Sequence, residues 1–538
     1  MKHSFLRLLA LILCCALLTG CSFSGKDLPL PTKGDSLLEG LTPYSEMVYT
    51  RPDMDALEQI LADALEAAAG KDLPKIIRSI YEFYDAYDLF FTNYSLADLR
   101  YSADLTDTYW QEESDFCTAN SPRVDAMLEE LYYGLAKSPC LPQLESANYF
   151  GPGYFDSYQG KNNWDTTFTA MMEEESALVS RYYELSSLGA EYETGTDDYF
   201  AAVYDEMAQL LVDLVSLRQE MADYWGYDSY NDFATDFYYY RDYTVSESRA
   251  YLQEIRQELT EIYRQVIGSG LWDQVLSSTG EADTYAYVER MAENMGGMVL
   301  ESFRVMDGLG LYDIGYGENK YPSSFEVYLT SYYVPFVFMS PTGNTYDYLV
   351  FTHEFGHFCT DYAAYGSYAG VDVLEVFSQG MEYLSLCYTG ADGTLIRTKM
   401  ADSLCLYVEQ AAYAEFEMAM YELSPEELTA ENLLELYERI GNDFGFDSYE
   451  FDPREFVTVT HYYTNPLYVI SYIVSNDAAM QLYQLEQENT GAGLECFEEN
   501  LTTQEYWFLA FLESAGLESP FTPGRIRQVR AIFEEILG

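Results

Sequence analysis

Residues 353–357 read His-Glu-Phe-Gly-His, and this motif constrains the fold more than any other part of the sequence. On an α-helix, residues four positions apart lie about 40° apart around the axis and one turn along it. A helix through the motif therefore lets His353 and His357 aim two imidazoles at one ion. Glu354 is offset by about 100°, which would place its carboxylate beside the ion as a base for water.

Zinc is the ion that this pattern favours, because zinc accepts imidazole and carboxylate ligands in an open tetrahedral site. The chain has only four histidines, His3, His353, His357 and His461, so the motif uses half of them. The alternative is a helix with two structural histidines and a surface glutamate. At this histidine content, chance would produce such a motif about once in 300 chains, which favours the metal site.

A zinc site with two histidines needs a third protein ligand and leaves a fourth position for water, whose pKa falls to about 7 on zinc. Residues 375–382 read Glu-Val-Phe-Ser-Gln-Gly-Met-Glu on an apolar-periodic stretch that predicts the next helix. A loop at residues 366–370 would let this helix return past the motif. Spacing alone leaves Asp372, Glu375 and Glu382 open as the third ligand.

The segment between Ser324 and Ser340 is β-branched and aromatic, which predicts strands. Pro335 cannot donate to a ladder, so its strand is expected at the edge of a sheet. Over most of the remaining chain, apolar residues recur at spacings of three and four, which predicts amphipathic helices with acidic outer faces.

The two motifs together, His-Glu-Phe-Gly-His and Glu-x-x-Ser-x-x-x-Glu, resemble the M3 metallopeptidases, the group of oligoendopeptidase F and thimet oligopeptidase. The resemblance covers roughly residues 325–480 and implies that Glu375 is the third ligand of one Zn²⁺ per chain. It also implies a mainly α fold with two lobes closing like a clam around a deep cleft, and a small β-sheet beside the motif helix. The segment around Phe336 and Phe338 resembles the family's substrate-lining edge strand, so both are expected to bind substrate.

A third segment, from His461 to Tyr472, also resembles the family, which places a histidine and tyrosines near the scissile carbonyl. The resemblance implies that His461 and Tyr468 act as catalytic donors to the oxyanion, with Tyr462 and Tyr472 as substrate-binding candidates. Pro466 departs from the family pattern and is expected to open a helix, with Asn465 as its cap. The alternative is a tyrosine-rich core helix with one buried histidine.

Two carboxylates are candidates for accepting a hydrogen bond from the imidazole nitrogen that does not bind the metal. Asp361 lies four residues after His357 on the same helix face and could accept the second N–H of a ligand imidazole. Glu382 faces nearly the same way as Glu375, seven residues earlier. For Asp361, the alternative is an exposed acid at the helix end.

The first 21 residues resemble a bacterial lipoprotein signal, with Lys2 and Arg7 before an apolar run and Leu18-Thr19-Gly20-Cys21 at its end. Cys21 would then carry a lipid that anchors an exported protein to the extracytoplasmic face of the cell membrane. The expected organisation is a signal at 1–21, a tether at 22–50, a helical N-terminal lobe at 51–320 and a zinc-binding catalytic lobe at 321–538. Six further cysteines could form disulfides outside the cytoplasm, and the sequence does not choose among their pairings.

The net charge is −61, from 28 basic and 89 acidic residues. No cationic footprint exists for nucleic acid, which is therefore excluded as a partner. An anionic membrane surface would repel the globular part, so membrane contact is expected only through the lipid anchor. We expect a monomer whose partners are short peptides.

The sequence therefore predicts a zinc-dependent oligoendopeptidase that cuts short peptides, with water on the zinc as nucleophile and Glu354 as its activating base. One alternative is a zinc exopeptidase of the same gluzincin class, a carboxypeptidase or a dipeptidase, with one end of the cleft blocked. A second alternative is a lipoprotein that binds peptides without cutting them.

Overall fold

The computed structural model describes residues 37–146, 149–159, 164–189, 192, 194–269, 279–367, 369–448 and 451–538. The predicted signal with Cys21 and the first part of the predicted tether lie outside these residues. None of the described helices has both the length and the apolarity that crossing a membrane requires. The six cysteines within the described ranges are free thiols.

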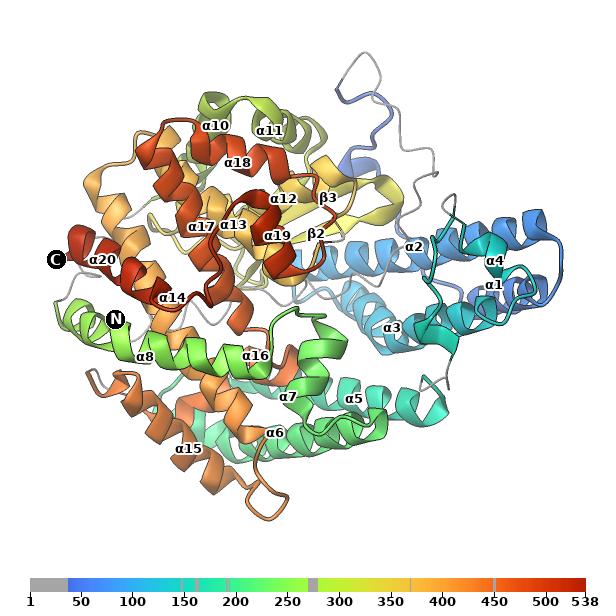
Figure 1. The fold of residues 1–538 in the computed structure, drawn as a ribbon, viewed down its shortest axis with the longest axis horizontal. Helices are drawn as coiled ribbons and strands as arrows, with labels where there is room; N and C mark the ends of the chain where they lie inside the picture. Colours follow the sequence, from blue (N-terminus) through green and yellow to red (C-terminus); the bar gives the residue numbers. More distant parts are fainter. Residues whose placement is uncertain are drawn as a thin grey trace.

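The first four helices form a unit with a hydrophobic core of its own, which projects to the right in Figure 1. The side chains of Asp53, Asp72 and Asp107 cap the first three by accepting hydrogen bonds from backbone amides of the first turn. Their core runs from Leu57 to Phe155. The four helices are α1 (Met54–Ala68), α2 (Leu73–Ala103), α3 (Thr108–Leu135) and α4 (Leu141–Leu144).

A second and larger core takes in most of the remaining chain. It joins Leu211, Phe355 and Ile473, so it runs across the boundary predicted near residue 320. Before the sheet it is built by α5 (Thr166–Gly189), α6 (Asp197–Trp225), α7 (Tyr230–Phe233), α8 (Val245–Gly268), α10 (Glu281–Met295) and α11 (Gly297–Leu309). After the sheet follow α12 (Asp347–Ala364), α13 (Val371–Tyr388), α14 (Gly393–Met420), α15 (Ala430–Asp443), α16 (Thr460–Thr464), α17 (Ile470–Glu488), α18 (Ala492–Asn500), α19 (Phe508–Ala515) and α20 (Arg525–Leu537).

The sheet has three strands in the order β1-β3-β2, with β1 at Tyr312–Asp313, β2 at Ser324–Leu329 and β3 at Val334–Met339. β3 runs parallel to β1 and antiparallel to β2. The expectation that the strand of Pro335 lies at an edge is therefore wrong, because β3 is the central strand. Within the described part of the chain, β2 is the strand that leaves a long edge unpaired.

Proline is tolerated in this central strand because β1 is short. The amide of Val337 donates to the carbonyl of Leu311, so alternate amides of β3 face β1. Pro335 would face the same way, but β1 pairs only with Val337 and Phe338. The missing N–H of Pro335 therefore falls before the ladder begins.

The prediction of a mainly α fold with a small β-sheet beside the motif helix is confirmed. α12 carries the motif and lies next to β2 and β3 in the centre of the larger body, with α13 and α17 beside it (Figure 1). This arrangement brings residues from distant parts of the chain to the motif.

Candidate active site

α12 and α13 bring the predicted ligands together. One ligand atom each from His353, His357 and Glu375 lies within 4.8 Å of the others, and all three residues are buried. Oε2 of Glu375 is 3.5 Å from Nε2 of His353 and 4.0 Å from Nε2 of His357. These separations are too long for hydrogen bonds, and both Nε2 atoms are buried without a hydrogen-bond partner in the described structure.

Gly356 in the motif allows α12 and α13 to approach this closely. A Cβ at this position would lie 2.6 Å from Cα of Ser378 and 2.8 Å from the carbonyl oxygen of Phe377, both backbone atoms of α13. Any larger residue would push the two helices apart. The glycine therefore places Glu375, one turn before these atoms, within reach of both histidines.

The three ligands fit a zinc ion. Ligand atoms about 2.0–2.2 Å from a tetrahedral ion lie about 3.3–3.6 Å from one another. The separation of 3.5 Å between Glu375 and His353 lies in this range, and that of 4.0 Å between Glu375 and His357 slightly exceeds it. Two imidazole nitrogens and one carboxylate form a donor set that zinc accepts, and the otherwise orphaned Nε2 atoms would gain a partner. His353, His357 and Glu375 are the residues that would hold the ion.

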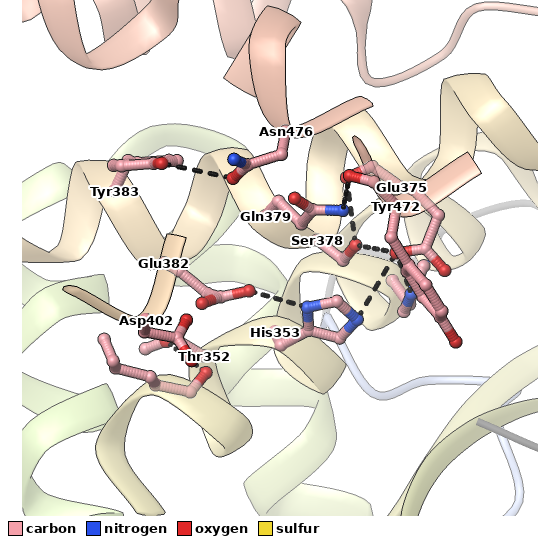
Figure 2. Close-up of polar contacts among 12 residues, drawn as sticks. Thr352, His353, Glu375, Ser378, Gln379, Glu382, Tyr383, Asp402, Tyr472 and Asn476 are labelled. Atoms are coloured by element: carbon pink, nitrogen blue, oxygen red, sulfur yellow. Dashed lines mark hydrogen bonds and ion pairs between the residues drawn. The ribbon is translucent and has the colours of Figure 1, made fainter. Parts of the chain in front are cut away.

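The orientation of His353 is set from behind by Glu382. Nδ1 of His353 donates to Oε1 of Glu382 over 2.7 Å, which leaves Nε2 free for a metal (Figure 2). Lys399 of α14 lies 2.8 Å from the other carboxylate oxygen of Glu382. Burial raises the pKa of Glu382, but Lys399 and His353 outweigh it and hold that pKa below its ordinary value.

Asp361 does not take the role expected for it. One of its oxygens accepts the amide of Ser367, just after the end of α12. The carboxyl faces Glu326 on β2, and burial raises the pKa of Asp361 to about 6. One turn after His357, the side chain of Asp361 lies against β2 and not against a ligand imidazole. Helical phase alone does not reveal this contact.

Glu354 is fully buried beside the ligands. Burial raises its pKa to about 8, the charges of Glu375 and Glu382 add to the rise, and His353 opposes it. The main chain of Glu326 on β2 also lies against this carboxyl and lowers its pKa. A carboxyl with a pKa near neutrality can both take up and release a proton.

The two candidate ligand histidines differ in the direction of their pKa shifts. Burial alone lowers the pKa of His353, but the hydrogen bond to Glu382 and the charge of Glu375 outweigh it and raise it to about 9. Burial, together with the charge of His353, holds the pKa of His357 well below its ordinary value. Metal binding must therefore displace a proton from His353, since only a neutral imidazole is a ligand.

Residues 459–472, here called the arm, bring a histidine and two tyrosines next to the candidate metal ligands. The hydroxyl of Tyr468 donates to Oε1 of Glu375 over 2.8 Å. Nε2 of His461 lies 3.2 Å from the hydroxyl of Tyr472. Burial lowers the pKa of His461 to about 4, so its imidazole is neutral at pH 7.

The helix predicted to open at Pro466 starts later. His461 lies in the short helix α16, Asn465 follows that helix as its C-cap, and α17 begins at Ile470. Between them, Leu467 adopts a left-handed conformation with φ of 62°, which is unfavourable for a branched residue. This turn, rather than helical phase, brings His461 and Tyr468 side by side, with ring centroids 5.7 Å apart.

The arm is held in this shape by buried polar side chains from other elements. Arg218 of α6, which is fully buried, donates to the carbonyl oxygen of Tyr462 over 2.7 Å and also to that of Tyr463. Oε1 of Glu417 accepts the amide of Leu467 over 2.9 Å. α6 and α14 thereby fix the backbone that carries the oxyanion candidates.

Three predicted substrate-binding residues lie in the core instead. Tyr462 is fully buried, with its ring 5.2 Å from that of Phe416. Phe336 packs against Tyr44, and Phe338 stacks on Phe325 with ring centroids 4.9 Å apart. Because both faces of β3 are covered, its aromatic side chains serve the core, and β2 is the strand that borders the site.

Sequence reasoning missed several residues that shape the site. Ser378 donates to Oε2 of Glu375 over 3.0 Å, and its spacing of three residues on a predicted helix could have revealed it. Glu326, Lys399 and Arg218 gave no signal in the sequence, because each reaches the site through tertiary packing.

Comparisons with known proteins bear on the family and the fold. Residues 44–163 match the model of the peptidase M3 N-terminal domain. A comparison with proteins of curated function finds no significant match to the sequence.

Solved structures cover nearly the whole chain. PZ peptidase A with an inhibitor matches with a TM-score of 0.80 and 19% identity, over 92% of this chain and 98% of that one. A Bacillus anthracis protein assigned as an oligoendopeptidase F matches with a TM-score of 0.76 and 20% identity, over 92% and 98%. Oligoendopeptidase F from Enterococcus faecium matches with a TM-score of 0.61 and 15% identity, over 90% and 96%. The fold implied by the motif resemblance is thus confirmed: residues 44–163 match the peptidase M3 N-terminal domain, and the chain has the fold of the oligoendopeptidase F structures.

Proposed function

We propose that this protein is a zinc-dependent peptidase that cuts short peptides at internal bonds. The observation that carries the proposal is the convergence of His353, His357 and Glu375 beside the buried carboxyl of Glu354. The M3 N-terminal domain and the oligoendopeptidase fold support peptide hydrolysis in general. Zinc and internal cleavage are the finer parts of the proposal.

When bound at these ligands, zinc would supply a Lewis acid that activates water and polarises the scissile carbonyl. Glu354 would take a proton from the attacking water and pass it to the leaving amine. Its burial among other carboxyls suits both steps, because the raised pKa favours proton uptake. Glu382 would hold His353 in the tautomer whose Nε2 binds metal.

The arm would supply hydrogen-bond donors for the oxyanion. His461 is neutral, so it can donate one N–H, and its contact with Tyr472 holds the ring in place. The hydroxyl of Tyr468 lies next to the candidate ligands, because it donates a hydrogen bond to Glu375. Removing one such donor from an oxyanion site typically costs 100- to 1,000-fold in kcat.

An extended peptide would pair with the outer edge of β2. The amide of Ser340 donates to the carbonyl of Ser323, so by alternation the main-chain groups of Ser324, Glu326 and Tyr328 face away from β3. The main chain of Glu326 lowers the pKa of Glu354, which supports a position of this edge next to the candidate base. Main-chain pairing here would present the scissile bond to Glu354.

We further propose, on sequence grounds, that Cys21 anchors the enzyme to the outer face of a bacterial membrane as a monomer. Metabolic labelling with a fatty acid tests the anchor, and a Cys21→Ser variant should lose the label and be released from membranes. Retention of the label in that variant contradicts the proposal.

The function is tested with the purified protein, a Glu354→Gln variant and a mixed peptide library read by mass spectrometry. We expect internal cleavage that disappears in the variant and under a chelator, while the variant keeps one zinc per chain by metal analysis. Trimming from one end alone would reassign the protein to the exopeptidases. Zinc binding without turnover of any peptide would leave a peptide-binding protein.

A further inference from the structure

A pocket of about 50 Å³ lies beside the candidate metal ligands, between α12, α13, α14 and α17. Its lining includes the polar residues His353, Gln379, Glu382, Asp402, Gln410 and Tyr472, together with Tyr346 and three aliphatic side chains. His353 and Tyr472 also belong to the candidate active site, so this pocket adjoins it. Figure 2 shows Glu382 pointing at His353, Asp402 beside Glu382, and the amide of Gln379 directed at the main chain of Tyr472.

Gln379 gives the pocket a hydrogen-bond acceptor in a fixed orientation. Its Nε2 donates to the carbonyl oxygen of Tyr472 over 3.1 Å, which determines the direction of the amide. Its Oε1 is buried without a hydrogen-bond partner in the described structure, and the residue is 1% exposed. Leaving a buried acceptor unsatisfied is unfavourable, so a ligand that brings a donor would be favoured here. Gln410, on α14, adds a second amide to the wall.

The charges around the pocket disfavour an acidic ligand. Glu382 and Asp402 are both buried, and Lys399 lies 2.8 Å from Glu382 and 3.4 Å from Asp402. Two carboxylates therefore face one ammonium group. A third carboxylate would be buried next to like charge, which is costly in a site of low polarity.

The volume limits the size of the side chain. A cavity of about 150 Å³ accepts a benzene ring, and this pocket has about a third of that space. An aromatic ring therefore does not fit without displacement of the four helices, whereas a hydroxyl or a carboxamide group does.

We propose that this pocket receives the substrate side chain on one side of the cleaved bond and selects small, uncharged side chains with a hydrogen-bond donor: serine, threonine or asparagine. The inference rests on the proposed peptidase function and adds a substrate class to it. Gln379 and Gln410 are the residues that set this preference.

The test is a cleavage profile of the zinc-loaded protein on peptides randomised at the two residues that flank the bond. Serine, threonine and asparagine should dominate at one flanking position. In matched peptides that differ only there, kcat/KM for asparagine should exceed that for phenylalanine by at least about tenfold. Gln410→Ala enlarges the pocket and should lower this ratio by at least about tenfold, whereas Gln59→Ala on the exposed face of α1 should leave it unchanged.

The ratio compares two peptides on one enzyme, so a partly unfolded preparation does not distort it. If Gln410→Ala does not fold, Gln410→Leu carries the test, and an apolar residue should then be preferred over asparagine. Aromatic or acidic residues preferred at both flanking positions, or a ratio that Gln410 variants do not change, would overturn the inference and leave the peptidase function standing. Absence of cleavage of any peptide would overturn both.

Discussion

Replacing Gly356 with alanine tests whether the close approach of α12 and α13 builds the metal site. The new Cβ would lie 2.6 Å from Cα of Ser378 and 2.8 Å from the carbonyl oxygen of Phe377. Carbon atoms in contact lie about 3.5–4.0 Å apart, so the helices must separate by about 1 Å. Both neighbours are backbone atoms, so no side chain can rotate to relieve the clash.

A displacement of about 1 Å is several times the tolerance of about 0.2 Å in metal–ligand distances. Overpacking of this kind typically costs about 1–3 kcal/mol. If zinc must restore the separation in order to bind Glu375 and both histidines, that cost appears as a zinc affinity about 5- to 150-fold weaker. Competition titration against a chromophoric chelator measures this affinity directly.

Gly380→Ala is the matched control, because it adds the same methyl group to α13, on the side that faces α17 and α18 instead of α12. Its Cβ would meet Cδ1 of Leu482 at 2.8 Å, the end of a flexible side chain on α17. We expect a small loss in melting temperature and unchanged zinc affinity. If Gly356→Ala binds zinc as tightly as the wild type, or loses no more affinity than Gly380→Ala, the packing argument is refuted.

Three further predictions concern buried charge. Burial raises the pKa of Glu409 to about 8, although the hydroxyl of Tyr263 donates a hydrogen bond to its carboxyl. The protonated carboxyl therefore contributes fully to the free energy of unfolding below the unfolded pKa near 4.5. This contribution is lost as the pH rises through 8. Between pH 6 and 9, Glu409→Gln should therefore unfold with a free energy a few kcal/mol higher than that of the wild type, as measured by chemical denaturation. If the free energy of unfolding depends on pH in the same way in both proteins, the prediction is contradicted. Lys399→Met leaves the carboxylate of Glu382 uncompensated and should weaken zinc binding about tenfold, with partial rescue by Lys399→Arg; unchanged affinity would exclude a role for Lys399. Arg218→Met frees the backbone of the arm and should reduce kcat more than zinc content or KM, and a loss of zinc instead would show that Arg218 supports the ligands.

Much of the site could be predicted because it lies within short stretches of helix. His353, Glu354 and His357 occupy one helix, so their relative positions follow from the helical period, and the structure brings both histidines together as expected. Glu375 as the third ligand needed the family resemblance, since any of several acids could have faced the motif. The mainly helical fold followed from apolar periodicity, which depends only on local sequence.

Errors arose where position depends on neighbours distant in sequence. Pro335 favours an edge strand by its own chemistry, but the short length of β1 lets it occupy the central strand. Phe336 and Phe338 are spaced as strand residues on one face of a sheet. Whether they contact substrate or the core depends on what covers that face.

The ligand helix, the candidate base and the chemistry that the ion requires follow from residue type and local spacing, so they could be predicted from the sequence. The carboxylate that supports His353, the turn of the arm at Leu467 and the lining of the pocket beside the ligands depend on tertiary packing. Each of those depends on side chains from α6, α13, α14 and α17 meeting at distances of a few ångströms. Packing of whole helices sets such distances, and local sequence does not encode them.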